Sequence, residues 1–202
     1  MPILKRENDV YPANLFESGL ALTRPAEDDV NWWVVYTVVR REKDLTRKLA
    51  GLKIPHYAPV VSKRYRSPNG RLRTSYIPLF ANYVFMLADE QQRYESMATN
   101  CILKCTPVTD YDMLVADLQR IYDVVQAGVP LTAESKLTAG DKVKVRSGPF
   151  AGYDGIVIRR EGKTRLLLSI RFLEEGVSME IDEGLLEITE RCKQQELSLI
   201  HI

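Results

Sequence analysis

The segment 63–73, KRYRSPNGRLR, carries five basic side chains and no acidic one. Its centre, Pro68-Asn69-Gly70, is the strongest turn signal in the chain and predicts a β-hairpin. On such a hairpin the basic side chains would project together and attract a phosphate backbone without reading its sequence. A solvated loop protected by its charges is the alternative. The candidate nucleic-acid contacts are Lys63, Arg64, Arg66, Arg71 and Arg73.

A second, weaker basic group lies in the segment 40–48, at the start of a predicted helix. Glu42 and Asp44 dilute its positive charge, and exposed charged faces are common on helices. Its candidate nucleic-acid contacts are Arg40, Arg41 and Arg47. The alternative is an ordinary solvated helix face.

The chain lacks the residue patterns of known catalytic and metal sites. It has no GxxxxGK[ST] loop and no GxGxxG sequence between a strand and a helix. Neither His56 nor His201 lies in a motif for nucleophilic or metal chemistry. Cys101 and Cys105 lie four residues apart, but no second cysteine pair exists to complete a zinc site. We therefore expect no enzyme activity, no catalytic residue, no metal and no cofactor.

The composition indicates a cytoplasmic protein that does not span a membrane. A chain of 202 residues can form one medium domain or two small ones. Its net charge of +1 says nothing about its partners. No apolar run approaches the roughly 18 residues that cross a bilayer, and the N-terminus lacks the apolar core of a signal peptide. Three cysteines, an odd number, fit free thiols in a reducing compartment.

Hydrophobic periodicity predicts an α+β domain in the first two thirds of the chain. Residues 1–31 lack sustained periodicity and are expected to be a flexible extension, although Leu15, Phe16, Leu20 and Leu22 would suit a short docking helix. Strands are expected over 32–39, 56–62, 76–87 and 102–108. Helices are expected over 41–50, 91–99 and 111–127, the last begun by Thr109 or Asp110. Together they predict one layer of sheet covered by helices.

The last third of the chain predicts a separate small β-barrel. Residues 129–138 contain Pro130 and follow a capped helix, so they are expected to be a linker. Strands are expected over 141–146, 155–160, 165–172 and 178–181, and closing them into a barrel would remove exposed edges. The tail 191–202 gives no clear signal.

The segment 140–158, GDKVKVRSGPFAGYDGIVI, combines a strand pattern with a glycine-rich turn. Val143 and Val145 alternate with basic residues, as in a half-buried strand. Gly152 and Gly155 are spaced for positive φ or for close backbone packing. Any small barrel with such a turn would fit the pattern, but the residue identities resemble the KOW motif, whose key glycine is matched by Gly155.

Two upstream segments resemble the NusG family. Trp32–Tyr36, WWVVY, is similar to the opening strand of its N-terminal (NGN) domain, and Leu79–Phe85, LFANYVF, is similar to a later strand motif. With the KOW-like segment they occur in the family's order, over about residues 32–189. The implied domains are an NGN-like domain at 32–128 and a KOW barrel at 139–190. Ala81 and Asn82 replace the usual proline and glycine, which favours a specialised, RfaH-like paralogue.

The resemblance implies a set of partners and contact residues. The NGN domain of the family receives the clamp helices of the largest RNA polymerase subunit, and the matching residues are Tyr83, Phe85, Tyr36, Val34 and Phe80. Core packing is the alternative role for these side chains. The KOW domain of the family binds a small-subunit ribosomal protein, Rho or other factors, and the matching residues are Phe150, Phe172 and Leu173. Core packing is again the alternative.

We therefore expect a monomeric transcription elongation and antitermination factor that binds RNA polymerase and upstream or non-template DNA. A specialised, operon-selective role is preferred over that of a general NusG acting in elongation and Rho-dependent termination. A ribosome-associated KOW protein that binds RNA is the alternative of another class, but it should be far more basic than +1.

Overall fold

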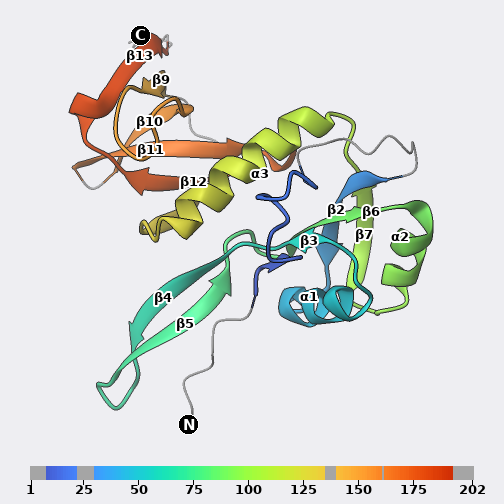
Figure 1. Cartoon of the computed structure of the whole chain (residues 1–202). Helices are drawn as coiled ribbons and strands as arrows, with labels where there is room; N and C mark the ends of the chain where they lie inside the picture. Colours follow the sequence, from blue (N-terminus) through green and yellow to red (C-terminus); the bar gives the residue numbers. More distant parts are fainter. Residues whose placement is uncertain (1–7, 22–29, 135–139, 161, 193–202) are drawn as a thin grey trace, which may run out of the picture.

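The computed structural model describes residues 8–21, 30–134, 140–160 and 162–192. Two antiparallel sheets lie on opposite sides of one long helix, α3 (Tyr111–Gln126), and a two-stranded hairpin projects away from them (Figure 1). The α+β class and the order of the main elements agree with the prediction. The predicted tail at 191–202 falls outside the described residues from 193 onward.

The N-terminal sheet has the strand order β1-β3-β6-β2-β7 and is antiparallel throughout. Its interior strand β2 carries the run of Trp and Val that predicted burial on both faces. Trp32 and Val34 pack into one hydrophobic cluster, and Trp33 and Val35 into the other. The bounds are β1 Val10–Tyr11, β2 Asn31–Thr37, β3 His56–Tyr57, β6 Tyr83–Ala88 and β7 Ile102–Pro107.

Helices cover both faces of this sheet. On one face, α1 (Glu42–Gly51) buries Leu45 and Leu49, and Arg93 of α2 (Glu90–Met97) lies over the ring of Trp33. On the other face, α3 packs its apolar stripe. The Asp110 side chain accepts a hydrogen bond of 2.9 Å from the Met113 backbone N–H and so caps α3, as the sequence predicts.

Two predicted strands are each divided in the structure. The strand expected over 56–62 breaks at Ala58 and Pro59, so that β3 ends and β4 (Val60–Arg66) begins a separate ribbon. The strand expected over 76–87 breaks after β5 (Leu72–Pro78) and resumes as β6. The cause of the second break is a turn in which Asn82 has φ 66°, a conformation that no strand residue adopts. As a result, β4 and β5 pair only with each other.

The described N-terminal residues pack against the domain, which differs from the expected flexible extension over 1–31. Strand β1 pairs with β3 at the sheet edge, and Leu15 and Phe16 are buried. These residues form turns in place of the short docking helix that the leucine spacing suggested. The hydroxyl of Tyr111 donates to the Ala21 carbonyl at 3.1 Å, which ties the segment to α3.

The C-terminal sheet has the strand order β13-β9-β10-β11-β12-β8 and is also antiparallel. Its first strand lies inside the expected linker 129–138, because residues 131–134 pair with β12. Its bounds are β8 Leu131–Glu134, β9 Asp141–Val145, β10 Asp154–Arg160, β11 Lys163–Ile170, β12 Glu175–Glu180 and β13 Leu186–Glu190. Short 3₁₀ turns cover Arg171–Leu173 and Glu183–Leu185.

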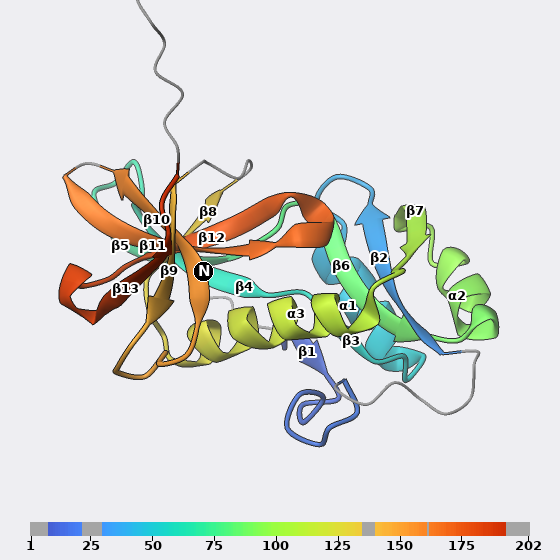
Figure 2. The same ribbon diagram turned by 90° about the horizontal axis from the view of Figure 1, so that it is seen from above.

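The two sheets share one hydrophobic cluster across α3. Seen from above, α3 runs alongside both sheets (Figure 2). Leu114 and Leu118 of α3 belong to the same cluster as Leu168 and Val177 of the C-terminal sheet. The C-terminal domain is therefore docked on the N-terminal domain, and α3 is the element that both domains use.

Candidate polymerase and nucleic-acid surfaces

The β4–β5 ribbon separates its side chains onto two faces. Cross-strand partners point to the same side, so Tyr65 shares a face with its partner Arg73 and with Lys63. We call this face A. Arg66 shares the opposite face, face B, with its partner Leu72. Face B also holds Ser62, Arg64, Thr74 and Tyr76.

All five predicted basic residues of the hairpin are exposed, and the structure brings them together on one ribbon (Figure 1). Among the described residues, none of the five forms a salt bridge with a carboxylate. Like charges crowded on a free ribbon repel one another, and bound phosphates would relieve that repulsion. The ribbon is thus an exposed cationic surface whose five charges have no ion-pair partner in the part of the chain that the structure describes.

The basic group of α1 is different, because part of its charge is neutralised. Arg41 and Lys48 both pair with Asp44, at 2.8 and 3.3 Å. Hydrogen bonds from Cys101, Arg41 and Lys48 lower the pKa of Asp44, so this carboxylate stays charged. Arg40 precedes the helix with φ 63°, and Arg47 lines a hollow beside His56. The sequence did not indicate this network.

The predicted polymerase contacts occupy two different environments. Tyr36 is 37% exposed and its ring lies 5.3 Å from that of its cross-strand partner Tyr83, which is half-buried. Val34, Phe80 and Phe85 are at most 4% exposed and fill the core beneath them. Tyr83 and Phe85 do share a face, as their parity predicts, but only the two tyrosines reach the surface.

The turn before β6 positions Tyr83. The backbone N–H of Asn82 donates to the Glu42 carboxylate at 2.8 Å, and the Asn82 carbonyl accepts from Thr37 at 2.8 Å. The positive φ of Asn82 explains why this position suits glycine or asparagine. Glu42, buried at the start of α1, is a supporting residue that the sequence analysis missed.

The KOW contact candidates lie at the margin of the hydrophobic cluster that the two sheets share. Phe150, Phe172 and Leu173 are half-buried and pack against the cluster centred on α3. Burial and the charge of Glu175, which begins β12, raise the pKa of Tyr83. The docked domain therefore borders the predicted polymerase surface.

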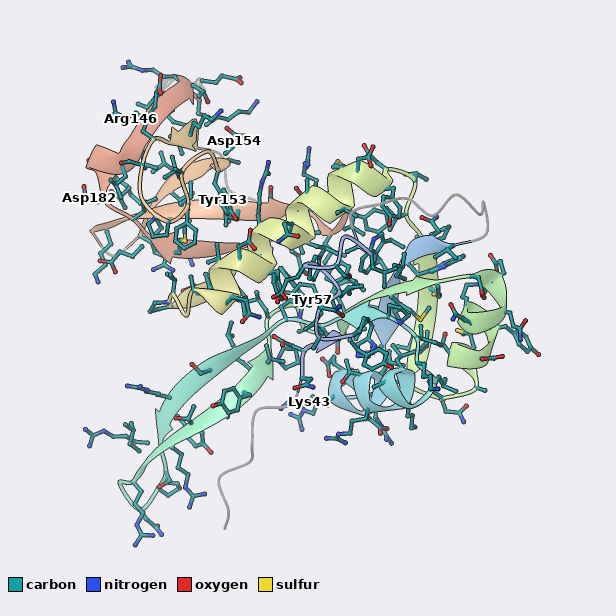
Figure 3. All side chains as sticks on the ribbon, viewed as in Figure 1. Lys43, Tyr57, Arg146, Tyr153, Asp154 and Asp182 are labelled. Carbon is teal, nitrogen blue, oxygen red and sulfur yellow. The ribbon has the colours of Figure 1, made fainter. Side chains whose placement is uncertain are left out.

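Polar contacts with α3 fix the docked domain. The Asp117 carboxylate, 1% exposed, accepts hydrogen bonds from the backbone N–H, Nε and an Nη of Arg171 at 3.0, 3.1 and 2.9 Å. The Asp117 hydrogen bond raises the pKa of Arg171. Tyr153, labelled in Figure 3, donates to Asp123 at 2.5 Å. The role of Asp117 was not predicted, although its position as an acid within the apolar stripe of 111–127 was a usable signal.

The glycines of the KOW-like segment have the roles expected of them. Gly152 has φ +90°, which only glycine adopts readily. A Cβ on Gly155 would lie 2.6 Å from Leu166 Cδ1 and 2.7 Å from the Leu167 carbonyl oxygen. Gly155 thus allows β10 and β11 to approach closely.

The cysteines are free thiols in different environments. Cys101 is buried, Cys192 is exposed, and burial raises the pKa of Cys105 to about 11. Among the described residues, no three His, Cys, Asp or Glu side chains are grouped as a metal site requires. Nor does the described part of the chain contain a helix long and apolar enough to cross a membrane.

Comparison with known families decides the identity of the two domains. Residues 30–127 match the family described as transcription termination factor NusG, and residues 139–169 match the KOW motif. The chain belongs to the NusG family. NusG proteins are non-enzymatic transcription factors, and both domains indicate a role in transcription elongation.

Comparison with individual proteins adds little to the NusG assignment. A solved structure titled crystal structure of MjSpt4:Spt5 complex, conformation B, matches with 17% identity, covering 80% of this chain and 99% of that one. Its TM-score of 0.24 is too low to support a structural argument. The search of curated proteins gave no match.

Proposed function

We propose that this NusG-family chain is a specialised elongation and antitermination factor that binds RNA polymerase and nearby DNA. The observation that carries the proposal is the paired, surface-reaching Tyr36 and Tyr83 on the NusG domain, together with the exposed basic ribbon of the same domain. Two aromatic rings above a rigid core are suitable anchors for a helix partner, because few side chains supply most of the affinity.

The proposed partner of the tyrosine pair is the clamp-helix element of the largest polymerase subunit. Val34, Phe80 and Phe85 support this surface from below by packing, and Glu42 fixes the turn that presents Tyr83. We assign the direct contacts to Tyr36 and Tyr83 and the supporting role to the three buried residues.

The proposed partner of the hairpin is upstream or non-template DNA. Its five exposed cations would contact phosphates and position the factor without reading bases. Arg40, Arg41 and Arg47 are secondary candidates, since Asp44 offsets part of their charge. The KOW domain would recruit a second protein, a ribosomal protein or Rho, through Phe150, Phe172 and Leu173.

An elongation assay tests this function. Added to core RNA polymerase on a template with pause sites, the parent chain should change pause lifetimes. Replacing Lys63, Arg64, Arg66, Arg71 and Arg73 together by Ala should weaken the effect and reduce its salt dependence. The matched control removes five exposed cations elsewhere, so that the net charge changes equally: Lys142, Lys144, Arg146, Arg159 and Lys163. An unchanged pause profile with the parent chain would contradict the proposal.

A further inference from the structure

A cleft of about 660 Å³ opens between face B of the β4–β5 ribbon and the C-terminal end of α3. One wall is formed by ribbon residues that include Ser62, Arg64 and Tyr76, and the other by residues at and after the end of α3 that include Val129 and Leu131. Ligand sites of proteins have volumes of roughly 300–1,000 Å³, so a nucleotide-sized group fits. Figure 1 shows the ribbon leaving the domain just below the end of α3.

The cleft combines an aromatic ring, an apolar wall and a free cation. Tyr76 is half-buried, and Lys43 holds its backbone carbonyl with a hydrogen bond of 2.8 Å, which fixes this part of β5. Across from it, Val129 and Leu131 present aliphatic surface. Arg64 lines the cleft, and the lining residues, all within the described part of the chain, include no Asp or Glu. A ligand with a flat apolar ring and a nearby negative charge would contact the aromatic ring, the aliphatic wall and the cation together.

Face B continues from the cleft toward the hairpin tip as a basic track. Arg66 follows Arg64 on the same face, and Arg71 lies beyond it in the loop. The spacing of alternate residues on a strand is about 6.6–6.8 Å, which is close to the distance between successive phosphates in an extended nucleic-acid strand. A ligand with repeated phosphates and one inserted base therefore fits the whole surface better than an isolated anion does.

We propose that this cleft binds one base of a single-stranded nucleic acid, whose phosphates follow Arg64 and Arg66 along face B. The base stacks on Tyr76 against Val129 and Leu131. A duplex cannot supply such a base without unpairing it, so the site selects single strands. This inference rests on the proposed nucleic-acid role of the hairpin and adds to it a stacking position and a choice of strand.

The site also connects the two domains. Leu131 begins β8, an edge strand of the C-terminal sheet, so one wall of the cleft includes the chain where it enters that sheet. A base held there contacts both the hairpin and the junction between domains.

Fluorescence anisotropy with the full chain tests the site, using labelled dT12, rU12 and a 12-base-pair DNA duplex as probes. Tyr76→Leu should weaken dT12 or rU12 binding about tenfold, because stacking is lost, and should change duplex binding less than about twofold. The matched control Tyr65→Leu, on face A, should change single-strand binding less than about twofold. Arg64→Ala should weaken all three probes and lower the salt slope by about one.

A variant on the opposite wall of the cleft tests the site without changing the hairpin, so misfolding of the hairpin cannot explain its effect. Val129→Trp should fill the cleft and weaken dT12 binding about as much as Tyr76→Leu does. When dT12 that carries 5-iodouracil is photocrosslinked to the chain, the crosslink should form at Tyr76, as mapped by mass spectrometry. Parent-like dT12 binding by both folded variants would overturn the cleft site.

The outcomes separate the cleft from the broader hairpin role. If the parent binds single strands and duplex equally, and only Arg64→Ala reduces binding, the hairpin function stands and the cleft site fails. If the parent binds none of the probes, both fail. The difference between dT12 and rU12 affinities identifies the natural strand as DNA or RNA.

Discussion

At the scale of single residues, charge and burial divide the side chains into those that contact partners and those that support them. Tyr36 and Tyr83 reach the surface, while Phe85, two residues along the same strand, fills the core. The alternation of side chains along a strand places Tyr83 and Phe85 on one face of β6, but it cannot tell how far each side chain is buried. The burial of each side chain depends on long-range packing, since Phe85 lies inside the hydrophobic cluster that includes α3 and Tyr83 lies at its margin.

His56 provides a residue-scale prediction of pH dependence. It is 2% exposed, it stacks on Tyr11 of β1, and its Nδ1 lies 2.9 Å from the Ile54 carbonyl, to which it must donate. Burial lowers its pKa, only partly offset by that hydrogen bond. The unfolded chain therefore takes up a proton first as pH falls, so His56 stabilises the fold above its unfolded pKa of about 6.5 and loses this contribution below it.

Thermal unfolding between pH 7.5 and 5 measures this effect. The difference in melting temperature between the parent and His56→Gln should shrink as pH falls, because a glutamine side chain does not titrate. A difference that stays constant over this range would contradict the assignment.

At the scale of elements, the sequence predicts best where periodicity is long and local. The helix at 111–127 and the buried strand from Trp32 match the structure within one or two residues at most ends, because their apolar spacing reflects their own burial. Strand β8 could not be predicted, since its four residues are a strand only through pairing with β12, more than forty residues away. The packing of Leu15 and Phe16 likewise depends on distant partners.

Gly155→Ala tests the close approach of β10 and β11. The new Cβ would meet the Leu167 carbonyl at 2.7 Å, and a backbone atom cannot move aside as a side chain can. We expect a loss of about 1–3 kcal/mol in the free energy of unfolding, measured by urea denaturation. Gly51→Ala is the control, because its Cβ would meet nothing within 4 Å and its effect should be neutral or slightly stabilising. Equal stability of the two variants would refute the packing argument.

At the scale of the whole molecule, the docking of the two domains depends on a buried carboxylate. Asp117 is shielded from water by the C-terminal domain, and Arg171 satisfies it from that domain. Arg171→Ala would remove both guanidinium hydrogen bonds to the buried carboxylate and leave Arg120, 3.9 Å away on α3, as its remaining cation, at a cost of about 1.5–3 kcal/mol. The chain can avoid this cost by undocking, which returns Asp117 to water.

We therefore expect Arg171→Ala to separate the domains without unfolding either one. Small-angle scattering should give a larger radius of gyration than that of the parent, and circular dichroism should be unchanged. Arg159→Ala breaks an exposed ion pair with Glu183 within the C-terminal domain and should leave the radius unchanged. A parent-like radius for Arg171→Ala would show that the apolar contacts alone hold the domains together.

Binding of the full chain to core RNA polymerase, measured by biolayer interferometry, tests the central claim most directly. Tyr36→Ala combined with Tyr83→Ala should weaken binding at least about tenfold, since aromatic anchors typically contribute about 2 kcal/mol or more. Tyr94→Ala, on α2 and 76% exposed, is the matched control and should bind as the parent does. Parent-like affinity of the folded double variant would contradict the polymerase surface proposed for this NusG-family protein.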